Sequence, residues 1–145
     1  MRKQGIINGK LMGALAGLGH TDRVVITDAG LPIPKECDLV IDLALINGIP
    51  SFLDTVKAVL NDIIVEKAVL FAPMKEANLA VYETLQEMIP KQEKELAGPD
   101  EFIEEVKKAK VVIRTAEFSP CCNMILYSAS GVKEMCEPLE VSFER

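Results

Sequence analysis

The chain has 145 residues, of which 49% are apolar and 26% charged, an ordinary composition for a single globular domain. Its formal net charge of −6 argues against a nucleic-acid-binding protein, which would present a basic face, and against attraction to anionic membranes. Since the apolar runs fall short of the roughly 20 residues of a membrane span and the N-terminus makes a poor signal peptide, we expect a cytoplasmic protein without a membrane partner.

Helix and strand signals alternate along the chain. Asn8 is placed to cap a first helix, and Ser51, with an acidic residue three positions later, begins another. Residues 24–26 are short, β-branched and continuously apolar, which is typical of a strand buried on both faces. In chain order we predict a helix over 9–18, strands over 24–26 and 39–43, a helix over 52–63, a strand over 65–71, helices over 78–89 and 99–108, and strands over 110–115 and 124–127.

This alternation predicts a single-domain α/β fold over residues 1–145, with a mostly parallel sheet flanked by helices. The segment 28–34 is then an irregular loop at the carboxyl end of a strand, where ligands of open α/β sheets bind. Residues 133–145 form an extra C-terminal tail of weak periodicity. Two interpretations of the tail stand equally: a frayed end, or an arm on a neighbouring subunit.

The four cysteines are Cys37, Cys121, Cys122 and Cys136, and none is paired with another in a C-x-x-C spacing. The single histidine is far from all of them in the sequence, which argues against a zinc site. In a chain without a secretion signal, reduced thiols are the simpler interpretation. We therefore predict neither a metal nor a cofactor.

The single histidine, His20, lies two residues before Asp22 and eight before Asp28. Imidazole is the side chain whose ordinary pKa is closest to neutrality, and carboxylates accept hydrogen bonds and orient it. We interpret this segment as a compact acid/base set for an enzyme that moves protons.

The sequence contains a set of specific motifs: Gly-His-Thr-Asp at 19–22, Asp-Ala-Gly-Leu-Pro-Ile-Pro at 28–34, Ile-Asp-Leu at 41–43, Pro-Ser-Phe at 50–52, Val-Val-Ile-Arg-Thr at 111–115, and Glu117, Ser119-Pro120 and Asn123. Together they resemble the RbsD/FucU family of sugar mutarotases, and within it the D-ribose pyranases more than the L-fucose mutarotases. The likeness extends from about Ile6 to Val132.

The resemblance implies an RbsD-like fold and an isomerase that interconverts the pyranose and furanose forms, or the anomers, of a free monosaccharide such as D-ribose. It implies a ring-shaped homo-oligomer, a pentamer or a decamer. It also implies that His20 is the proton donor, that Asp28 binds the sugar, and that residues 121–123 match a Tyr-Ala-Asn segment that holds sugar hydroxyls.

Ring opening needs one proton taken from the anomeric hydroxyl and one given to the ring oxygen, which suits His20 as a general acid/base. Asp22 would orient the imidazole, because residues two apart point the same way in an extended segment; a turn cap is the equal alternative for Asp22. Asn123 would bind a sugar hydroxyl or, alternatively, satisfy the backbone of the preceding Ser119-Pro120 turn.

The chain departs from the family pattern at three sugar-contact positions. Cys121 stands in place of a tyrosine, Pro99 in place of a histidine or arginine, and Ile103 in place of a lysine. By position, we expect Cys121 and Cys122 to line the site.

Three functions remain in competition. The leading hypothesis is a pyranase or mutarotase of D-ribose or a related sugar. The alternatives are a non-catalytic sugar-binding or transport-associated protein, and an L-fucose-type mutarotase. We further expect that the oligomer completes the site, because so short a chain supplies few sugar-binding groups, and that Arg114 and Glu117 form a structural pair.

Overall fold

The computed structural model describes residues 1–132 and 138–142. The strands are β1 (Arg23–Thr27), β2 (Val40–Asp42), β3 (Val65–Phe71), β4 (Glu93–Ala97), β5 (Val111–Arg114) and β6 (Met124–Ser128). The helices are α1 (Gly9–Ala16), α2 (Phe52–Leu60), α3 (Met74–Ala77), α4 (Leu79–Met88) and α5 (Pro99–Val106).

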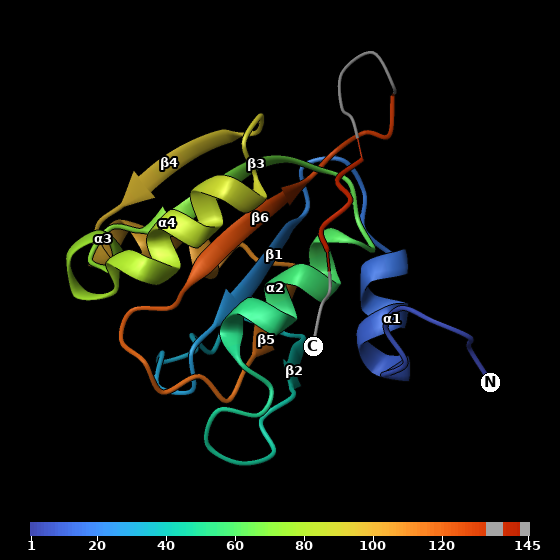
Figure 1. Ribbon diagram of the computed structural model, residues 1–145, viewed down its shortest axis with the longest axis horizontal. Helices are drawn as coiled ribbons and strands as arrows, with labels where there is room; N and C mark the ends of the chain where they lie inside the picture. Colours follow the sequence, from blue (N-terminus) through green and yellow to red (C-terminus); the bar gives the residue numbers. More distant parts are fainter. Residues whose placement is uncertain (133–137, 143–145) are drawn as a thin grey trace.

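The strands form a six-stranded sheet in the order β2-β5-β1-β6-β3-β4 (Figure 1). Strand β6 runs antiparallel to both of its neighbours, β1 and β3. The pairs β1–β5, β2–β5 and β3–β4 are parallel. The predicted α/β architecture, a mostly parallel sheet flanked by helices, is therefore confirmed, with one antiparallel strand near its centre.

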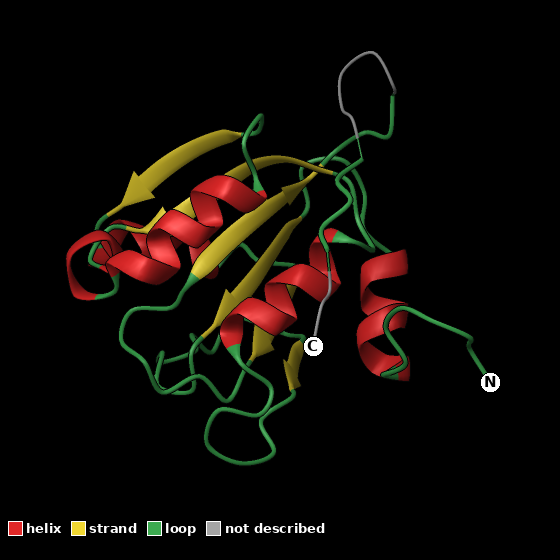
Figure 2. Cartoon of the chain, in the orientation of Figure 1, coloured by secondary structure: helices red, strands yellow, loops and turns green. Residues whose placement is uncertain are grey.

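Both faces of the sheet are covered. Val24 and Ile26 of β1 are buried in a large core that also contains residues of α1, α2 and α4, whereas Val25 is buried in a smaller core with Phe102 and Val106 of α5. Figure 2 shows α2 and α4 in front of the strands. Since successive side chains of a strand point to opposite faces, burial on both faces explains why these strands are continuously apolar.

The predicted helix starts are confirmed. The side chain of Asn8 accepts a hydrogen bond from the amide of Leu11 at 3.0 Å, and the hydroxyl of Ser51 accepts one from the amide of Asp54 at 3.1 Å. Helix α1 ends earlier than predicted, because Gly17, its C-cap, already departs from helical geometry.

Two elements were missed by the sequence analysis: α3, a helix of four residues, and strand β4. β4 lies at the edge of the sheet, pairs with β3, and carries charged residues along most of its length. Charged side chains are typical of edge strands, which they protect from further pairing. They also remove the apolar periodicity by which a strand is recognised.

The described part of the C-terminal tail packs on its own chain. Val141 exchanges two hydrogen bonds with the side chain of Asn61, at 2.8 and 2.9 Å, and Leu139 packs against the large core. Neither expectation for the tail anticipated this. Residues 133–137 and 143–145, and the predicted thiol of Cys136 with them, lie outside the described residues.

None of the helices described here is long and apolar enough to cross a membrane.

Candidate active site

A cavity of about 560 Å³ opens at one end of the strands of the sheet. Strands β1, β3 and β5 end on this side, and β6 begins there because it runs antiparallel. The loops that follow the first three strands and precede the fourth therefore meet, at the carboxyl ends where ligands of α/β sheets bind. The lining residues are Asp28, Ala29, Gly30, Leu31, Pro32, Phe71, Arg114, Glu117, Phe118, Ser119, Pro120, Cys121 and Asn123.

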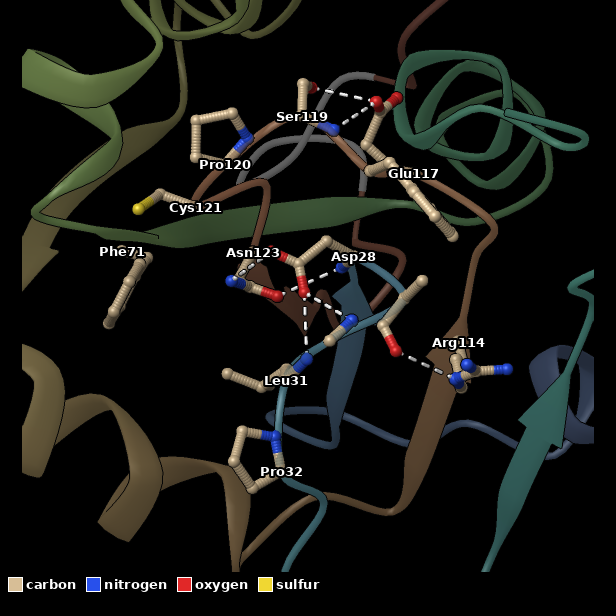
Figure 3. Close-up of a pocket in the computed structure, with 13 residues that line it drawn as sticks. Asp28, Leu31, Pro32, Phe71, Arg114, Glu117, Ser119, Pro120, Cys121 and Asn123 are labelled. Atoms are coloured by element: carbon tan, nitrogen blue, oxygen red, sulfur yellow. Dashed lines mark hydrogen bonds between the residues drawn. The ribbon is translucent and has the colours of Figure 1, made fainter. Parts of the chain in front are cut away.

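A carboxylate–amide pair occupies the middle of the cavity (Figure 3). The side-chain amide of Asn123 donates to the carboxylate of Asp28 at 3.2 Å, and its oxygen accepts the backbone N–H of Asp28 at 3.0 Å. The other carboxylate oxygen of Asp28 accepts the amides of Gly30 and Leu31, at 3.1 and 2.9 Å. The sequence predicted both residues for the site, and the fold brings them together across 95 positions of the chain.

Burial raises the pKa of Asp28 above its ordinary value, although the amides of Gly30 and Leu31, the side chain of Asn123 and the amide of Cys122 all act to lower it. Asn123 is only 2% exposed and is hydrogen-bonded to Asp28. It therefore holds the Asp28 carboxylate in one orientation. Asp28 is thus a preorganised hydrogen-bond acceptor in a partly dry site.

Two buried threonines support the loops beneath this pair. The hydroxyl of Thr115 donates to the backbone carbonyl oxygen of Thr27 at 2.6 Å. The hydroxyl of Thr27 donates to the backbone carbonyl oxygen of Asp28 at 2.8 Å. The amide of Ala29 donates to the carbonyl oxygen of Glu117 at 2.9 Å. These bonds join the loop after β1 to the loop after β5 and fix the floor of the cavity.

Glu117 connects the cavity wall to the start of α2. Its carboxylate accepts the amide and the hydroxyl of Ser119, at 3.0 and 2.8 Å, and the amide of Phe52 at 3.2 Å. Burial alone would raise the pKa of Glu117, but these hydrogen bonds outweigh it and hold the pKa below its ordinary value.

The expected pairing of Arg114 with Glu117 is wrong. The guanidinium of Arg114 instead forms an ion pair with Asp42 of β2, at 3.0 Å, and donates to the carbonyl oxygen of Ala29 at 3.2 Å. Strand pairing explains this, since Arg114 and Asp42 lie in register on β5 and β2.

The two adjacent cysteines point to different places. Cys121 lines the cavity as expected. Cys122 does not, contrary to the expectation, because its side chain is fully buried in the large core. The backbone of Cys121 is left-handed, with φ 63°, in the turn that separates the two side chains. Burial raises the pKa of Cys121, and it raises that of Cys122 to about 11. Both thiols are therefore protonated at neutral pH and are poor nucleophiles.

His20 lies at the opposite end of the strands from the cavity, just before the start of β1. Residues 23–27 form β1, and the four steps along this strand alone span about 13 Å. The compact acid/base set suggested by the sequence is therefore not assembled within one chain: Asp28 is in the cavity and His20 is not. We call the two ends the pocket edge (Asp28, Phe71, Arg114 and Asn123) and the histidine edge (His20, Asp22, Glu66 and Ser128).

At the histidine edge, the imidazole of His20 is 48% exposed and its Nε2 lies 3.0 Å from Oε2 of Glu66. Asp22 has other partners: its carboxylate accepts the ammonium of Lys110 at 2.8 Å and the amide of Gly19 at 2.7 Å. These two hydrogen bonds lower the pKa of Asp22. The geometry thus agrees with the turn-capping alternative for Asp22.

Several site residues escaped the sequence analysis. Phe71 forms an apolar wall of the cavity, and no local signal marked it, because the end of a buried strand is equally typical of core residues. Leu31, which also lines the cavity, lies in the 28–34 loop that the sequence predicted for ligand binding but was not singled out. Glu66 was missed because it is distant from His20 in sequence. The family sugar-contact positions occupied by Pro99 and Ile103 lie on α5, outside the cavity lining.

Among the described residues, no group of three or more histidine, cysteine, aspartate or glutamate side chains is arranged to hold a metal ion.

The fold and the cavity are those of an α/β protein with a small-molecule site, in which a partly buried carboxylate–amide pair lies at the carboxyl ends of the strands. The model of the RbsD/FucU transport protein family matches residues 1–132, and the chain belongs to this family.

Named relatives support the same assignment. The chain is 46% identical over 128 residues to the D-ribose pyranase of Geobacillus thermodenitrificans, covering 88% of this chain and 96% of the relative. It is 44% identical to that of Bacillus subtilis, covering 87% and 95%.

Two solved structures have related folds. The structure of Bacillus subtilis RbsD complexed with D-ribose matches with a TM-score of 0.85 and 43% identity, over 89% of this chain and 98% of that one. The fucose mutarotase of Streptococcus pneumoniae, solved in complex with L-fucose, matches with a TM-score of 0.71 but only 23% identity, over 85% and 93%. The second likeness concerns the fold alone.

Proposed function

We propose that this protein is a D-ribose pyranase, an isomerase that interconverts the pyranose and furanose forms of D-ribose. The observation that carries the proposal is the Asp28–Asn123 pair in the cavity of a chain 46% identical to a named D-ribose pyranase. The cavity volume of about 560 Å³ lies within the range of small-molecule sites.

The reaction needs only proton transfers. A base removes the proton of the anomeric hydroxyl, an acid protonates the ring oxygen, and the bond from the anomeric carbon to the ring oxygen breaks to give the open-chain aldehyde. Attack by a different hydroxyl closes the other ring. His20 is the acid/base in this scheme, and Asp28 accepts hydrogen bonds from the sugar hydroxyls.

His20 reaches a sugar in this scheme from a neighbouring copy of the chain. The histidine edge and the pocket edge lie at opposite ends of β1, so a contact between them joins different surfaces of two copies. Such head-to-tail contacts close into rings when the rotation allows. A ring-shaped homo-oligomer therefore supplies each cavity with the His20 of the next subunit.

An exposed apolar patch beside the cavity favours such an assembly. Leu45, Ile46 and Ile49 have relative exposures of 76, 62 and 53%, and Phe118 of the cavity wall has 67%. The amide of Gly48 donates to the carbonyl oxygen of Ala116 at 2.8 Å, which places this loop next to the segment that bears Phe118. Large exposed apolar patches are typical of interaction surfaces.

Exchange spectroscopy tests the activity. NMR saturation transfer between the anomeric signals of D-ribose should show faster pyranose–furanose exchange with the protein present, and a smaller effect on L-fucose. Faster exchange of L-fucose than of D-ribose would identify a fucose-type mutarotase instead.

A non-catalytic sugar-binding protein is the second candidate, favoured by Cys121 in the cavity wall at the position of the family tyrosine. Tight binding of D-ribose with unchanged exchange would establish that function in place of the enzyme.

Mixing variants tests the shared site. His20→Ala and Asp28→Asn chains, each impaired alone at a low ribose concentration, should regain activity when refolded together, because about a quarter of the contacts then join an intact His20 to an intact Asp28. Absence of recovery in a mixed oligomer would contradict a site built from two chains. Full activity of a protein that ultracentrifugation shows to be monomeric would contradict it as well.

A further inference from the structure

Two backbone irregularities meet at His20. Thr21, the next residue, has φ 66°, a left-handed conformation that is uncommon for a threonine. On the neighbouring part of the sheet, the pairing of β3 with β6 shifts register between Val65 and Lys67. Glu66 is the residue at this shift. Irregularities of both kinds are common at functional sites, where they redirect side chains.

The sheet brings the two irregularities together through β6. The amide of Thr21 donates to the carbonyl oxygen of Ser128 at 2.8 Å, and the amide of Ser128 donates to the backbone carbonyl oxygen of Asp22 at 2.9 Å. Ser128 in turn pairs with Val65. The left-handed residue and the register shift therefore flank the same end of β6, and the result is the 3.0 Å contact between His20 Nε2 and Glu66 Oε2.

Among the described residues, Glu66 is the carboxylate that contacts the imidazole. The Asp22 carboxylate is engaged by Lys110 and by the amide of Gly19. Glu66 is 29% exposed and so is partly shielded from water. Since an ionised carboxylate accepts hydrogen bonds but cannot donate, a neutral imidazole in this contact carries its hydrogen on Nε2 and its lone pair on Nδ1.

We infer that Glu66 is the positioning residue of the acid/base: it orients His20 and fixes the tautomer in which Nδ1 accepts and returns protons. This inference rests on the proposed pyranase function, and it assigns to Glu66 the orienting role that the sequence suggested for Asp22.

The first experiment measures the tautomer directly. The chain has a single histidine, so two-bond ¹H–¹⁵N correlation spectra of the ¹⁵N-labelled full-length protein contain one pair of imidazole nitrogens. In the wild type at alkaline pH, Nε2 should show the protonated shift and Nδ1 the lone-pair shift. In Glu66→Gln both shifts should move toward an average of the two tautomers, since an amide can donate as well as accept.

The second experiment measures the rate. Glu66→Gln should lower the maximal D-ribose exchange rate by about 10-fold, less than the 10²–10⁴-fold expected when the acid/base itself is lost. The concentration of ribose at half-maximal rate should stay unchanged, because in this scheme Glu66 contacts the Nε2 of His20 and not the sugar. Glu66→Asp, which keeps an acceptor, should regain part of the rate.

Glu95→Gln is the matched control. Glu95 is also a carboxylate on this sheet, but it forms an ion pair with Lys67 at 2.8 Å. The Glu95→Gln variant should show the wild-type exchange rate and the wild-type imidazole spectrum. Melting temperature and oligomeric state are compared for all variants, so that a folding defect is recognised.

A double variant completes the test. Adding Glu66→Gln to His20→Ala should cost no further activity, because residues that act as a unit are not additive. If His20→Ala loses exchange while Glu66→Gln keeps both the wild-type rate and the wild-type spectrum, the role of Glu66 is refuted and the proposed function stands. If the wild type itself does not accelerate exchange, the proposed function fails, and the positioning role fails with it.

Discussion

The two ends of the sheet are built differently. At the pocket edge, Asp28 and Asn123 are bound to each other and to the backbone, and buried threonines support the loops beneath them. At the histidine edge, His20 is half exposed and contacts one carboxylate. At the pocket edge the polar side chains are satisfied within a single chain. At the histidine edge the imidazole faces outward, and this asymmetry fits the proposed site that a second copy completes.

Removing the imidazole is the largest expected effect. His20→Ala should reduce the catalysed D-ribose exchange by about 10²–10⁴-fold, because it removes the proposed general acid/base and the chain has a single histidine. Ribose binding, measured by calorimetry, should be retained, since the cavity is formed by other residues. Equal loss of binding and of rate would mean that His20 grips the sugar rather than transferring protons.

Changing the half-buried carboxylate of Asp28 should act on binding. Asp28→Asn removes a charged acceptor and leaves one oxygen where there were two, so the new NH2 group faces either the amide of Asn123 or the backbone amides of Gly30 and Leu31. Loss of a hydrogen bond to a charged group costs about 1.5–3 kcal/mol, which corresponds to roughly 10–100-fold weaker ribose binding. A calorimetric titration measures this. Wild-type affinity would show that the sugar does not contact Asp28.

Restoring the family tyrosine should sharpen the pocket edge. Cys121→Tyr adds a hydroxyl to the cavity wall, and the left-handed backbone at this position is already occupied by a residue with a side chain. One added neutral hydrogen bond is worth about 0.5–1.5 kcal/mol, so ribose binding should strengthen by roughly 2- to 10-fold. Weaker binding would show that the small Cys121 leaves space for a different sugar or sugar contact.

The smallest effect concerns the pH dependence of stability. The pKa of Glu117 is lowered, so its ionised form stabilises the fold at neutral pH, and this contribution is lost as the pH falls below about 4. Glu117→Gln should lower stability by about 1 kcal/mol at pH 7, because Glu117 is partly exposed. The difference from the wild type should shrink in acid. Thermal melts from pH 3 to 7 measure it, and a constant difference would contradict the assignment.

Elements with strong local signals are predictable from the sequence. The caps at Asn8 and Ser51, the buried strand at 24–26 and the loop at 28–34 are all recognisable from a few neighbouring residues. Strand β4 is not, because its charges hide the apolar pattern of a strand. The proximity of Arg114 and Glu117 in the sequence suggests a pair that does not form. In the fold Arg114 lies beside Asp42 instead, a partner from another strand.

The sequence by itself determined the family motifs, the alternating helices and strands, and the identity of the acid/base candidate, because a single histidine leaves no choice. Only the tertiary structure decided which of these residues meet. Antiparallel β6 brings Asn123 to Asp28 at one edge, and the β3–β6 register shift brings Glu66 to His20 at the other. Strand order and register depend on packing between distant segments, whereas local periodicity reports only which face of its own segment a side chain occupies.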